Sequence, residues 1–272
     1  MALTLKLFEQ MTELMKVSLS AGRYDVRLAK SISEIKAAQN LRYEVLFKES
    51  GGRVTRDMLT SEREEDEWDE VAYHVVVVDR KEDNKIVGTV RLVSGHALSE
   101  GQSFYTEKAF NLDGIREYYD STLELSRACV SASVRGGVIL MLMWKFTMQL
   151  IKDNHYDVLF GCASFSGTDY HQHTEILSYL YQRHLADKAL MPHPLADVQS
   201  IAIEQFQETT GPDKKPGQVP TLLRGYLKLG AKVSDHAILD PVFNTTFVAI
   251  YVDTAKMFAS NHVLVSKSVT SA

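Results

Sequence analysis

The sequence predicts an α+β fold in which a mixed central sheet is flanked by helices and carries a helical insertion. Short segments with strand-like alternation recur along the 272 residues, and a long helix rich in Leu and Met stands between two of them. From residue 164 to residue 219 this alternation stops, which indicates an insertion or lid. We therefore expect one main domain over 21–255, preceded by a separate segment at 1–20 and followed by a tail at 256–272.

The centre of the predicted sheet is a strand–helix–strand unit. Residues 122–130 alternate as a strand, in which Arg127 falls on the apolar side unless a bulge re-aims it. A turn with two glycines leads into a helix at 138–153, which lacks Pro and Gly and is apolar on nearly every side, so we expect it to be buried. A short apolar strand follows at 156–160. This order predicts a right-handed βαβ crossover.

The other elements follow from the same periodicities. Residues 1–20 have the spacing of an amphipathic helix, which would pack on the domain, mediate dimerisation or lie on a membrane surface. Ser33 is the expected N-cap of a helix at 33–47. Trp68 interrupts an acidic loop at 51–70, and because Trp is costly to expose we expect this part of the loop to fold over something. The remaining predicted elements are strands at 24–28, 73–79 and 85–93, the last two joined by an Asp83–Asn84 turn, a loop with a short helix at 94–120, helices at 173–189 and 220–229, closing strands at 233–239 and 247–252, and a polar tail past Met257.

Composition narrows the class of protein. The net charge is −5 and the pI is about 6.0, which gives no general case for nucleic-acid binding. Cys129 and Cys162 both lie in apolar predicted strands, so we expect inert core thiols in a reducing cytoplasm rather than a disulfide framework or a nucleophile. No apolar run is long enough to span a membrane, and no secretory signal is visible.

The glycine turn before the long helix suggests a binding use. Arg135, Gly136 and Gly137 open the helix, and free backbone N–H groups at a helix N-terminus suit a phosphate such as that of coenzyme A or phosphopantetheine. The alternative is a helix that simply needs a flexible entry. The turn matches neither a dinucleotide fingerprint nor a P-loop, because the G-x-G-x-x-G pattern and the Gly-Lys-Ser/Thr sequence are both absent.

A series of short motifs in a fixed order resembles the acyl-homoserine-lactone synthase superfamily, which is GNAT-like and uses acyl carrier protein thioesters. The motifs are Arg42 before an aromatic residue, the Asp66 and Asp69 pair in DEWD, His74 at the start of a valine strand, Gly88–Arg91, and Glu124–Arg127 as E-x-S-R. In the C-terminal half, GCASF, LSYLYQRHLA and GYLKLGA closely resemble the L-ornithine Nα-acyltransferases. The resemblance covers roughly residues 24–253 and implies a GNAT-type fold.

This resemblance implies an N-acyltransferase that moves a (3-hydroxy)acyl group from acyl carrier protein to the α-amine of ornithine, the first step of ornithine lipid synthesis. The alternatives are a synthase of an acyl-homoserine lactone or another N-acyl amino acid, and a non-catalytic binding module of the same fold. Two departures leave the acceptor open: His236 stands where a small residue is usual, and Phe247 stands where the family often has Asp. The implied location is the cytoplasm, with peripheral contact at the inner membrane as a further option.

Roles for individual residues follow from the resemblance and from the chemistry of amine attack on a thioester. Glu124 is the expected base that takes the amine proton, and Arg127 is the second expected catalytic residue. Alternatively, Glu124 forms an ion pair with Arg91 or Arg127. Arg42, Asp66, Asp69 and Arg91 are the expected substrate-binding residues, and the aspartate pair suits a cationic side-chain amine. Arg91 and Arg127 would either bind the substrate carboxylate or hold the two aspartates in place. The glycine turn is the expected site of the donor phosphate. The acyl-phosphopantetheine of the carrier protein serves as donor, and we expect no bound cofactor and no metal.

Three histidines form a further candidate metal site. His171, His173 and His184 include two histidines separated by one residue, and their spacing is a weak pattern for a metal ion. Asp169 with His173 is expected instead to stabilise the insertion.

Overall fold

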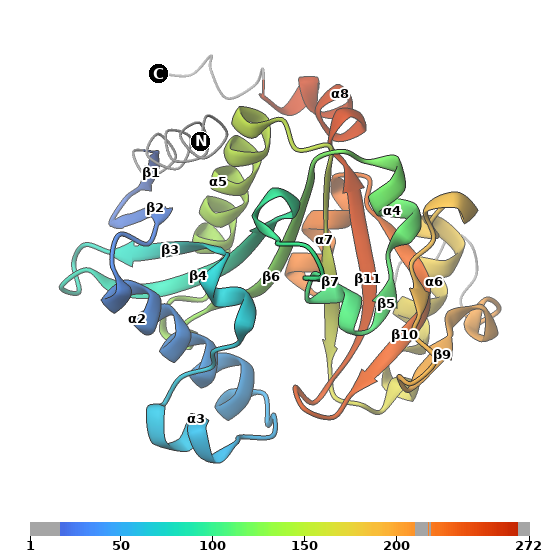
Figure 1. Cartoon of the computed structure of the whole chain (residues 1–272), viewed down its shortest axis with the longest axis horizontal. Coiled ribbons are helices and arrows are strands. Elements are labelled where there is room, and N and C mark those ends of the chain that lie inside the picture. The colour runs from blue at the N-terminus through green and yellow to red at the C-terminus, as the bar shows by residue number, and fades with distance from the viewer. Residues whose placement is uncertain (1–16, 210–216, 218, 266–272) are drawn as a thin grey trace. The chain divides into compact units, whose positions relative to one another are not determined.

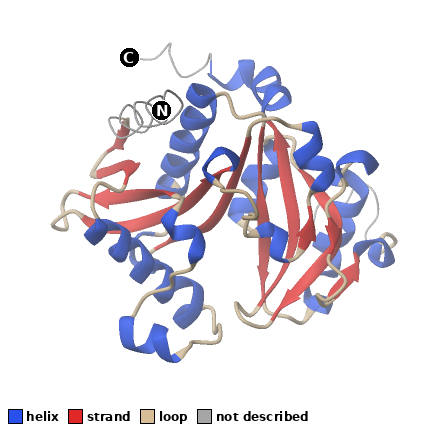
Figure 2. Ribbon diagram, in the orientation of Figure 1, coloured by secondary structure: helices blue, strands red, loops and turns tan. Residues whose placement is uncertain are grey.

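The computed structural model describes residues 17–209, 217 and 219–265 of the chain. Contacts along the chain divide it into two compact units. The first unit comprises residues 1–93 and 125–155, and the second comprises residues 94–124 and 156–272. Each unit combines strands with helices, which confirms the α+β class (Figures 1 and 2).

The first unit is built on a sheet with the strand order β1-β2-β3-β4-β6. Its strands are β1 (Ser18–Ala21), β2 (Tyr24–Leu28), β3 (Tyr73–Asp79), β4 (Lys85–Ser94) and β6 (Thr122–Val130), the last of which begins in the second unit. The edge strand β1 shows that the predicted helix at 1–20 is wrong at residues 18–20, which pair antiparallel with β2. The rest of that prediction, residues 1–16, lies outside the described residues.

The turn between β3 and β4 is the predicted one. Asp83 and Asn84 both have positive φ, 49° and 57°, a left-handed conformation that Asp and Asn adopt more readily than most residues. The two strands pair antiparallel on either side of the turn, with one register shift between Val77 and Val78. Local turn chemistry therefore sets this hairpin.

Two helices cover opposite faces of this sheet. Helix α2 (Ile32–Tyr43) continues as a π-helical turn, η1 (Glu44–Glu49), and its Ala38 and Leu41 pack against a core of Val76, Val78, Ile86 and Cys129. Helix α5 (Val138–Asn154) lies against the other face, where a Cβ at Gly88 would come within 2.6 Å of Ile139 Cγ2. The absence of a side chain at Gly88 thus admits α5 close to the sheet.

Two predictions about these helices are wrong in detail. The N-cap of α2 is Ser31, whose Oγ accepts the N–H of Glu34, and not Ser33. The Leu- and Met-rich helix is buried on one face only, because the side chains of Val138 and Met141 are 44% and 45% exposed. The acidic loop forms the short helices α3 (Arg56–Ser61) and η2 (Glu67–Glu70), and it buries Trp68 of η2, which is 4% exposed, as predicted.

The second unit has a four-stranded antiparallel arrangement in the order β7-β11-β10-β9 and a separate β5–β8 pair. Its elements are η3 (Gly95–Ala97), η4 (Thr106–Lys108), β5 (Phe110–Asn111), α4 (Asp113–Tyr118), β7 (Val158–Ser166), η6 (Tyr170–His173), α6 (Thr174–His184), η7 (Lys188–Leu190), β8 (His193–Pro194), β9 (Ser200–Ala202), η8 (Ile203–Phe206), α7 (Thr221–Lys228), β10 (Lys232–Asp240), β11 (Thr245–Asp253) and α8 (Thr254–Val265). Strands β7 and β11 pair in register from Thr245–Ser166 to Asp253–Val158.

Three predicted boundaries change in this unit. The strand expected at 156–160 runs from Val158 to Ser166, because pairing with β11 extends it beyond its apolar core. The stretch 164–219 contributes β9 to the sheet, so the sheet pattern does not stop there. The expected polar tail past Met257 is helical as far as Val265. Whether residues 164–219 act as an insertion or lid stays a prediction.

We also compared the helices with the requirements of a bilayer. Within the described part of the chain, no helix is both long enough and apolar enough to cross a membrane.

Candidate active site

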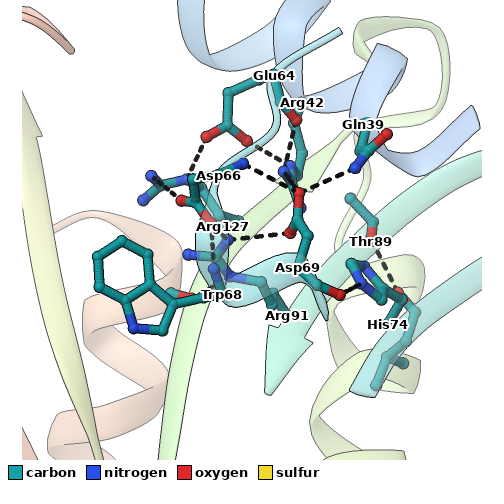
Figure 3. A network of polar contacts seen from close by, with 12 residues as sticks. Gln39, Arg42, Glu64, Asp66, Trp68, Asp69, His74, Thr89, Arg91 and Arg127 are labelled. Atoms are coloured by element: carbon teal, nitrogen blue, oxygen red, sulfur yellow. Dashed lines mark hydrogen bonds and ion pairs between the residues drawn. The ribbon is translucent and has the colours of Figure 1, made fainter. Parts of the chain in front are cut away.

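The first unit contains a cluster of six charged side chains that we call the ion cluster. It joins residues far apart in the sequence, from α2, the acidic loop, β4 and β6 (Figure 3). Its members are Arg42, Glu64, Asp66, Asp69, Arg91 and Arg127. Three guanidinium groups face three carboxylates, so the formal charges of the cluster sum to zero.

Arg42 lies at the centre of the cluster and is 1% exposed. Its Nη1 and Nη2 donate to Asp69 Oδ1 and Oδ2 at 2.8 and 2.7 Å, a bidentate pair. Nη2 also donates to the carbonyl oxygen of Glu64 at 2.5 Å, and Nε lies 2.5 Å from Glu64 Oε2. Gln39 adds a further donor to Asp69 Oδ2 at 2.9 Å. Arg42 therefore connects helix α2 to Glu64 and Asp69, the two ends of the acidic segment 64–69.

Arg91 and Arg127 hold the remaining carboxylate oxygens. Arg91 Nη1 donates to Asp66 Oδ1 and, at 3.0 Å, to Asp69 Oδ1, while its Nε donates to Ser126 Oγ at 3.1 Å. Arg127 Nε donates to Glu64 Oε1 at 2.9 Å, and its Nη2 donates to Asp66 Oδ2 at 3.0 Å. Both arginines thus neutralise carboxylates of the acidic loop.

The backbone of Arg127 explains how a residue on the apolar side of the strand reaches this cluster. Its φ is 55° within β6, a left-handed conformation that breaks the alternation of the strand. The bulge that Arg127 needs in order to leave the apolar side of the strand is therefore present. A non-glycine residue in this conformation costs on the order of 1 kcal/mol or more, and the two ion pairs of Arg127 help to hold it there.

The acidic segment presents its carboxylates because it caps its own short helix. Asp66 Oδ1 accepts the N–H of Trp68 at 3.1 Å, and Asp69 Oδ2 accepts the N–H of Asp66 at 3.4 Å, which together form a capping box around η2. The guanidinium of Arg91 lies 5.9 Å from the centre of the Trp68 ring. Local capping therefore fixes the spacing of Asp66 and Asp69.

Burial and charge act against each other on the titrating groups here. Burial alone would raise the pKa of Asp69, but the hydrogen bond from Arg42 and the charges of Arg42 and Arg91 outweigh it and hold that pKa well below its usual range. Burial lowers the pKa of His74, whose Nε2 lies 2.9 Å from the carbonyl oxygen of Asp69. Asp69 is thus kept ionised beside a histidine whose protonation is disfavoured by burial.

The structure brings together Arg42, Asp66, Asp69, Arg91 and Arg127, five of the residues that the sequence singled out. Glu64, the sixth member, was not predicted, although it is 2% exposed and bonds two of the arginines. It stands in the run SEREEDEWDE, in which no periodicity separates a buried acid from its solvated neighbours. The contacts match the role of holding the aspartates in place.

Glu124 occupies a different environment, in the part of β6 that belongs to the second unit. Its side chain is 0% exposed. Its Oε1 accepts the backbone N–H of Thr106 at 2.7 Å, and its Oε2 accepts the backbone N–H of Tyr105 at 3.1 Å. Hydrogen bonds from N–H groups favour the charged form of a carboxylate. Backbone donors therefore hold both oxygens of this buried acid.

Two groups beside Glu124 were not predicted as site residues. The Oγ1 of Thr106 lies 3.6 Å from Cys162 Sγ. Tyr226, on α7, is 1% exposed; burial, followed by the charges of Cys162 and Glu124, raises the pKa of its phenol far above the ordinary value. The one sequence signal for Tyr226 was its place in GYLKLGA, a segment that carried the family resemblance. Its hydroxyl keeps its proton at neutral pH.

Cys129, the other cysteine that was expected to be an inert core thiol, is buried. Cys129 is 6% exposed and packs with Leu41 and Ile86, and burial raises the pKa of its thiol to about 12. Such a thiol is almost entirely protonated at neutral pH, so it is a poor nucleophile. This environment agrees with the interpretation of Cys129 as an inert core residue.

The glycine turn lies at the start of α5, as the sequence requires for a phosphate site. Gly137 has φ 85° and caps the helix, and neither it nor Gly136 would bring a Cβ within 4 Å of another group. Arg135 forms a two-pronged pair with Glu49, with Nη2 2.7 Å from Oε2, and its Nε lies 3.3 Å from the carbonyl oxygen of Val130. Arg135 thus has both a carboxylate and a loop carbonyl as partners.

The histidines weighed as metal ligands make separate contacts. His173 Nε2 lies 3.1 Å from the carbonyl oxygen of Ser166, and His184 Nδ1 lies 3.3 Å from that of Ala231. Asp169 accepts the N–H of His171 at 3.2 Å. Among the described residues, no three His, Cys, Asp or Glu side chains are placed to hold a metal ion.

The two departures from the family pattern have structural settings. Phe247 is 7% exposed and stacks edge-on with Phe110, with ring centres 6.1 Å apart, so its ring fills the core of the second unit. His236 follows the register shift of β10, and its Nδ1 lies 2.8 Å from Asp235 Oδ1.

Comparisons with known proteins point to one family. Residues 41–145 match the family model of the acetyltransferase (GNAT) domain. The L-ornithine N(alpha)-acyltransferase of Rhodobacter capsulatus is 32% identical over 240 residues, covering 86% of this chain and 91% of the relative. The enzyme of the same name from Agrobacterium fabrum is 30% identical over 239 residues, covering 84% and 80%.

A solved structure, FeeM, an N-acyl amino acid synthase from uncultured soil microbes, is 12% identical with a TM-score of 0.44, covering 87% of this chain and 94% of its own; at this level it carries no argument about function. The sequence relatives decide the family. The chain is a GNAT-type acyltransferase that belongs to the L-ornithine N(alpha)-acyltransferases.

Proposed function

We propose that this protein transfers a (3-hydroxy)acyl group from the thioester of acyl carrier protein to the α-amine of ornithine. Membership of the family supports the reaction and the acceptor. Within the structure, the observation that carries the proposal is Glu124, a fully buried carboxylate whose two oxygens are held by the N–H groups of Tyr105 and Thr106.

The proposed chemistry needs one base and one proton donor. The neutral amine attacks the thioester carbon, the new C–N bond forms as the C–S bond breaks, and the amine proton passes to Glu124 directly or through water. The leaving thiolate takes up the proton that Glu124 received, directly or through water, and the phenol of Tyr226, which burial keeps protonated, can donate a hydrogen bond to it. No acyl-enzyme forms, so neither cysteine is required.

For the ion cluster we propose a positioning role. Of the two roles that the sequence left open, the contacts support holding Asp66 and Asp69 over binding of the substrate carboxylate, since Arg91 is already paired with both acids and is 1% exposed. Arg127 would then act on catalysis through the bulge it anchors in β6. Asp66, whose side chain is 17% exposed, is the member most open to solvent.

For the donor we propose that Arg135, Gly136 and Gly137 receive the phosphate of the phosphopantetheine arm. The first N–H groups of α5, a helix of 17 residues, lack partners within the helix and suit an anion. Glu49 offers Arg135 a carboxylate in the forked geometry that a phosphate also takes. The donor phosphate would compete with Glu49 for that guanidinium.

The test is direct acyl transfer with purified components. Protein, 3-hydroxyacyl-acyl carrier protein and ornithine are incubated, and N-acyl-ornithine is measured by mass spectrometry. We expect product that depends on all three components and much less product when acyl-coenzyme A replaces the carrier protein. For the Glu124→Gln variant, Glu117→Gln is the matched control, because Glu117 is an exposed carboxylate. Absence of N-acyl-ornithine, or preferred formation of an acyl-homoserine lactone, would contradict the proposal.

A further inference from the structure

A small cavity in the second unit has no role in the chemistry described so far. Its volume is about 190 Å³. Charged and phenolic side chains dominate its lining: Tyr119, Asp187, Lys232, Tyr251, Asp253 and Lys256. The two phenols are buried, with Tyr119 7% and Tyr251 3% exposed. Two carboxylates and two ammonium groups therefore surround a space between buried tyrosines.

We infer that this cavity binds the side-chain ammonium of the amino-acid acceptor and so selects a diamino acid. The inference rests on the proposed function. The sequence assigned this ammonium to Asp66 and Asp69, but both are paired with arginines in a cluster whose charges already balance. The arginine partners of both aspartates are almost fully buried and cannot move out into solvent, so recognition requires an acid whose own partner is exposed.

Asp253 has the geometry of a prepared ammonium receptor. Its Oδ2 accepts the hydroxyl of Tyr119 at 3.1 Å, and its Oδ1 accepts the backbone N–H of Lys256 at 2.9 Å, so the carboxylate is fixed before any ligand arrives. The Nζ of Lys256 lies 3.8 Å from Oδ2, while the Lys256 side chain is 78% exposed. An exposed lysine thus shows where an ammonium sits, and a ligand ammonium can displace it at low cost.

The size of the cavity selects among the reactants. At about 30 Å³ per water in the liquid, it holds the equivalent of about six waters, below the range of about 300–1,000 Å³ typical for larger ligands. A phosphopantetheine arm or a long acyl chain does not fit. The ammonium and methylene groups of a small amino acid do, with Leu190 and Leu229 as apolar lining.

The cavity also lies on the same face of the strands as the Glu124 environment. Asp253 of β11 is paired with Val158 of β7, and Cys162 is four residues further along β7 on that face, about 13 Å away along the strand. Cys162 contacts Thr106, whose N–H donates to Glu124. The two nitrogens of extended ornithine are about 6 Å apart, and a hydrogen bond of about 3 Å at each end extends its reach to about 12 Å. A side-chain ammonium at Asp253 therefore directs the α-amine along the strands toward the base.

A purely structural role for Asp253 is the alternative, because it accepts the Lys256 N–H at the start of α8 as a helix cap does. Asp253→Asn separates the two roles. Asn is as good a cap as Asp: its oxygen can accept the Lys256 N–H and its NH₂ group can donate to the Tyr119 hydroxyl oxygen, so most of the stability is kept while the charge is lost. If Asp253 only caps α8, Asp253→Asn should not change the substrate preference. If Asp253 binds the ammonium, the variant should change that preference strongly.

The experiment measures kcat/KM for ornithine and for norvaline, which lacks the side-chain amine, in wild type and variants. Where norvaline turns over too slowly for kinetics, equilibrium dialysis gives the ratio of the binding affinities of the two amino acids instead. We expect Asp253→Asn to lower the ornithine-to-norvaline ratio about tenfold, as for loss of one charged hydrogen bond. Lys256→Met should raise ornithine affinity by a few-fold at most, because it removes the competing ammonium. Asp197→Asn, at an exposed acid of the same unit, is the control.

The outcomes are distinct. No acylation of ornithine by wild type would reject the proposed function itself. Acylation by wild type with an unchanged ratio in Asp253→Asn would overturn this inference and leave the function standing. If Asp66→Asn lowers the ratio and Asp253→Asn does not, the ammonium binds at the ion cluster, as the sequence predicted.

Discussion

The ion cluster and the Glu124 environment are two buried sets of carboxylates that the same chain treats in opposite ways. In the first, three acids are matched by three arginines through side-chain contacts. In the second, one acid is held by two backbone N–H groups and lies near a protonated phenol. Both kinds of donor favour the charged carboxylate, but a full arginine charge lowers its affinity for a proton more than a neutral N–H group does. We therefore assign structure to the first set and chemistry to the second.

The largest effect on stability is expected from breaking the ion cluster at Arg42. Arg42→Met leaves Glu64 and Asp69 with uncompensated buried charge, which typically costs about 3–5 kcal/mol of unfolding free energy. Urea unfolding followed by the fluorescence of buried Trp68 measures this change. The control is Arg116→Met, at a pair in which the arginine is 45% exposed, where about 0–1 kcal/mol is expected. Equal losses in the two variants would show that the cluster is not a stabilising element.

A second test uses pH on the histidine beside the cluster. Burial lowers the pKa of His74 in the folded state, so below the unfolded value of about 6.5 the unfolded chain binds this proton more strongly. Stability should therefore be complete above that pH and fall as the pH drops through it, by up to about 1.4 kcal/mol per pH unit. His74→Gln should flatten this part of the unfolding profile. A profile with the same slope in the variant would remove His74 from the account.

A smaller effect is expected at the core thiol. Cys129→Ala removes a buried sulfur and should cost about 1 kcal/mol of stability with little loss of turnover, since the proposed reaction has no acyl-enzyme. Cys162→Ala should likewise retain measurable turnover. Mass spectrometry after incubation with acyl donor alone checks this. An acylated cysteine in that experiment would overturn direct attack by the amine.

The smallest effect concerns the donor end of the reaction. Glu49→Gln removes the carboxylate that competes for Arg135, an exposed pair worth about 0–1 kcal/mol, so the KM for acyl carrier protein should fall by a few-fold at most. Arg135→Glu should raise that KM and reduce its dependence on salt. Steady-state kinetics at two ionic strengths measure both. Unchanged KM values and salt dependence in both variants would place the donor site elsewhere.

The parts of this picture that local chemistry controls could be predicted from the sequence. The Asp83–Asn84 turn, the strands around it and the burial of Trp68 follow from residue preferences and periodicity. The grouping of Arg42, Asp66, Asp69, Arg91 and Arg127 followed from motifs, and the bulge at Arg127 from a conflict between its charge and its place on the strand.

The remaining parts depend on tertiary contacts. Glu64 lies in an acidic run without periodicity, and only the positions of Arg42 and Arg127 distinguish it from its neighbours. Strand β9 exists because β10 provides an edge for pairing, not because its three residues favour a strand. The donors to Glu124 are backbone N–H groups of Tyr105 and Thr106, which carry no sequence signal at all.

Glu124→Gln tests most directly whether chemistry belongs to the second set of carboxylates. The amide keeps the shape but loses the basicity, so the single-turnover rate of acyl transfer to ornithine should fall about a hundredfold or more. The unfolding free energy should fall by only about 1–2 kcal/mol, because the amide N–H₂ group faces one of the two backbone donors. A variant that folds and transfers the acyl group at the wild-type rate would contradict the assignment of Glu124 as the base.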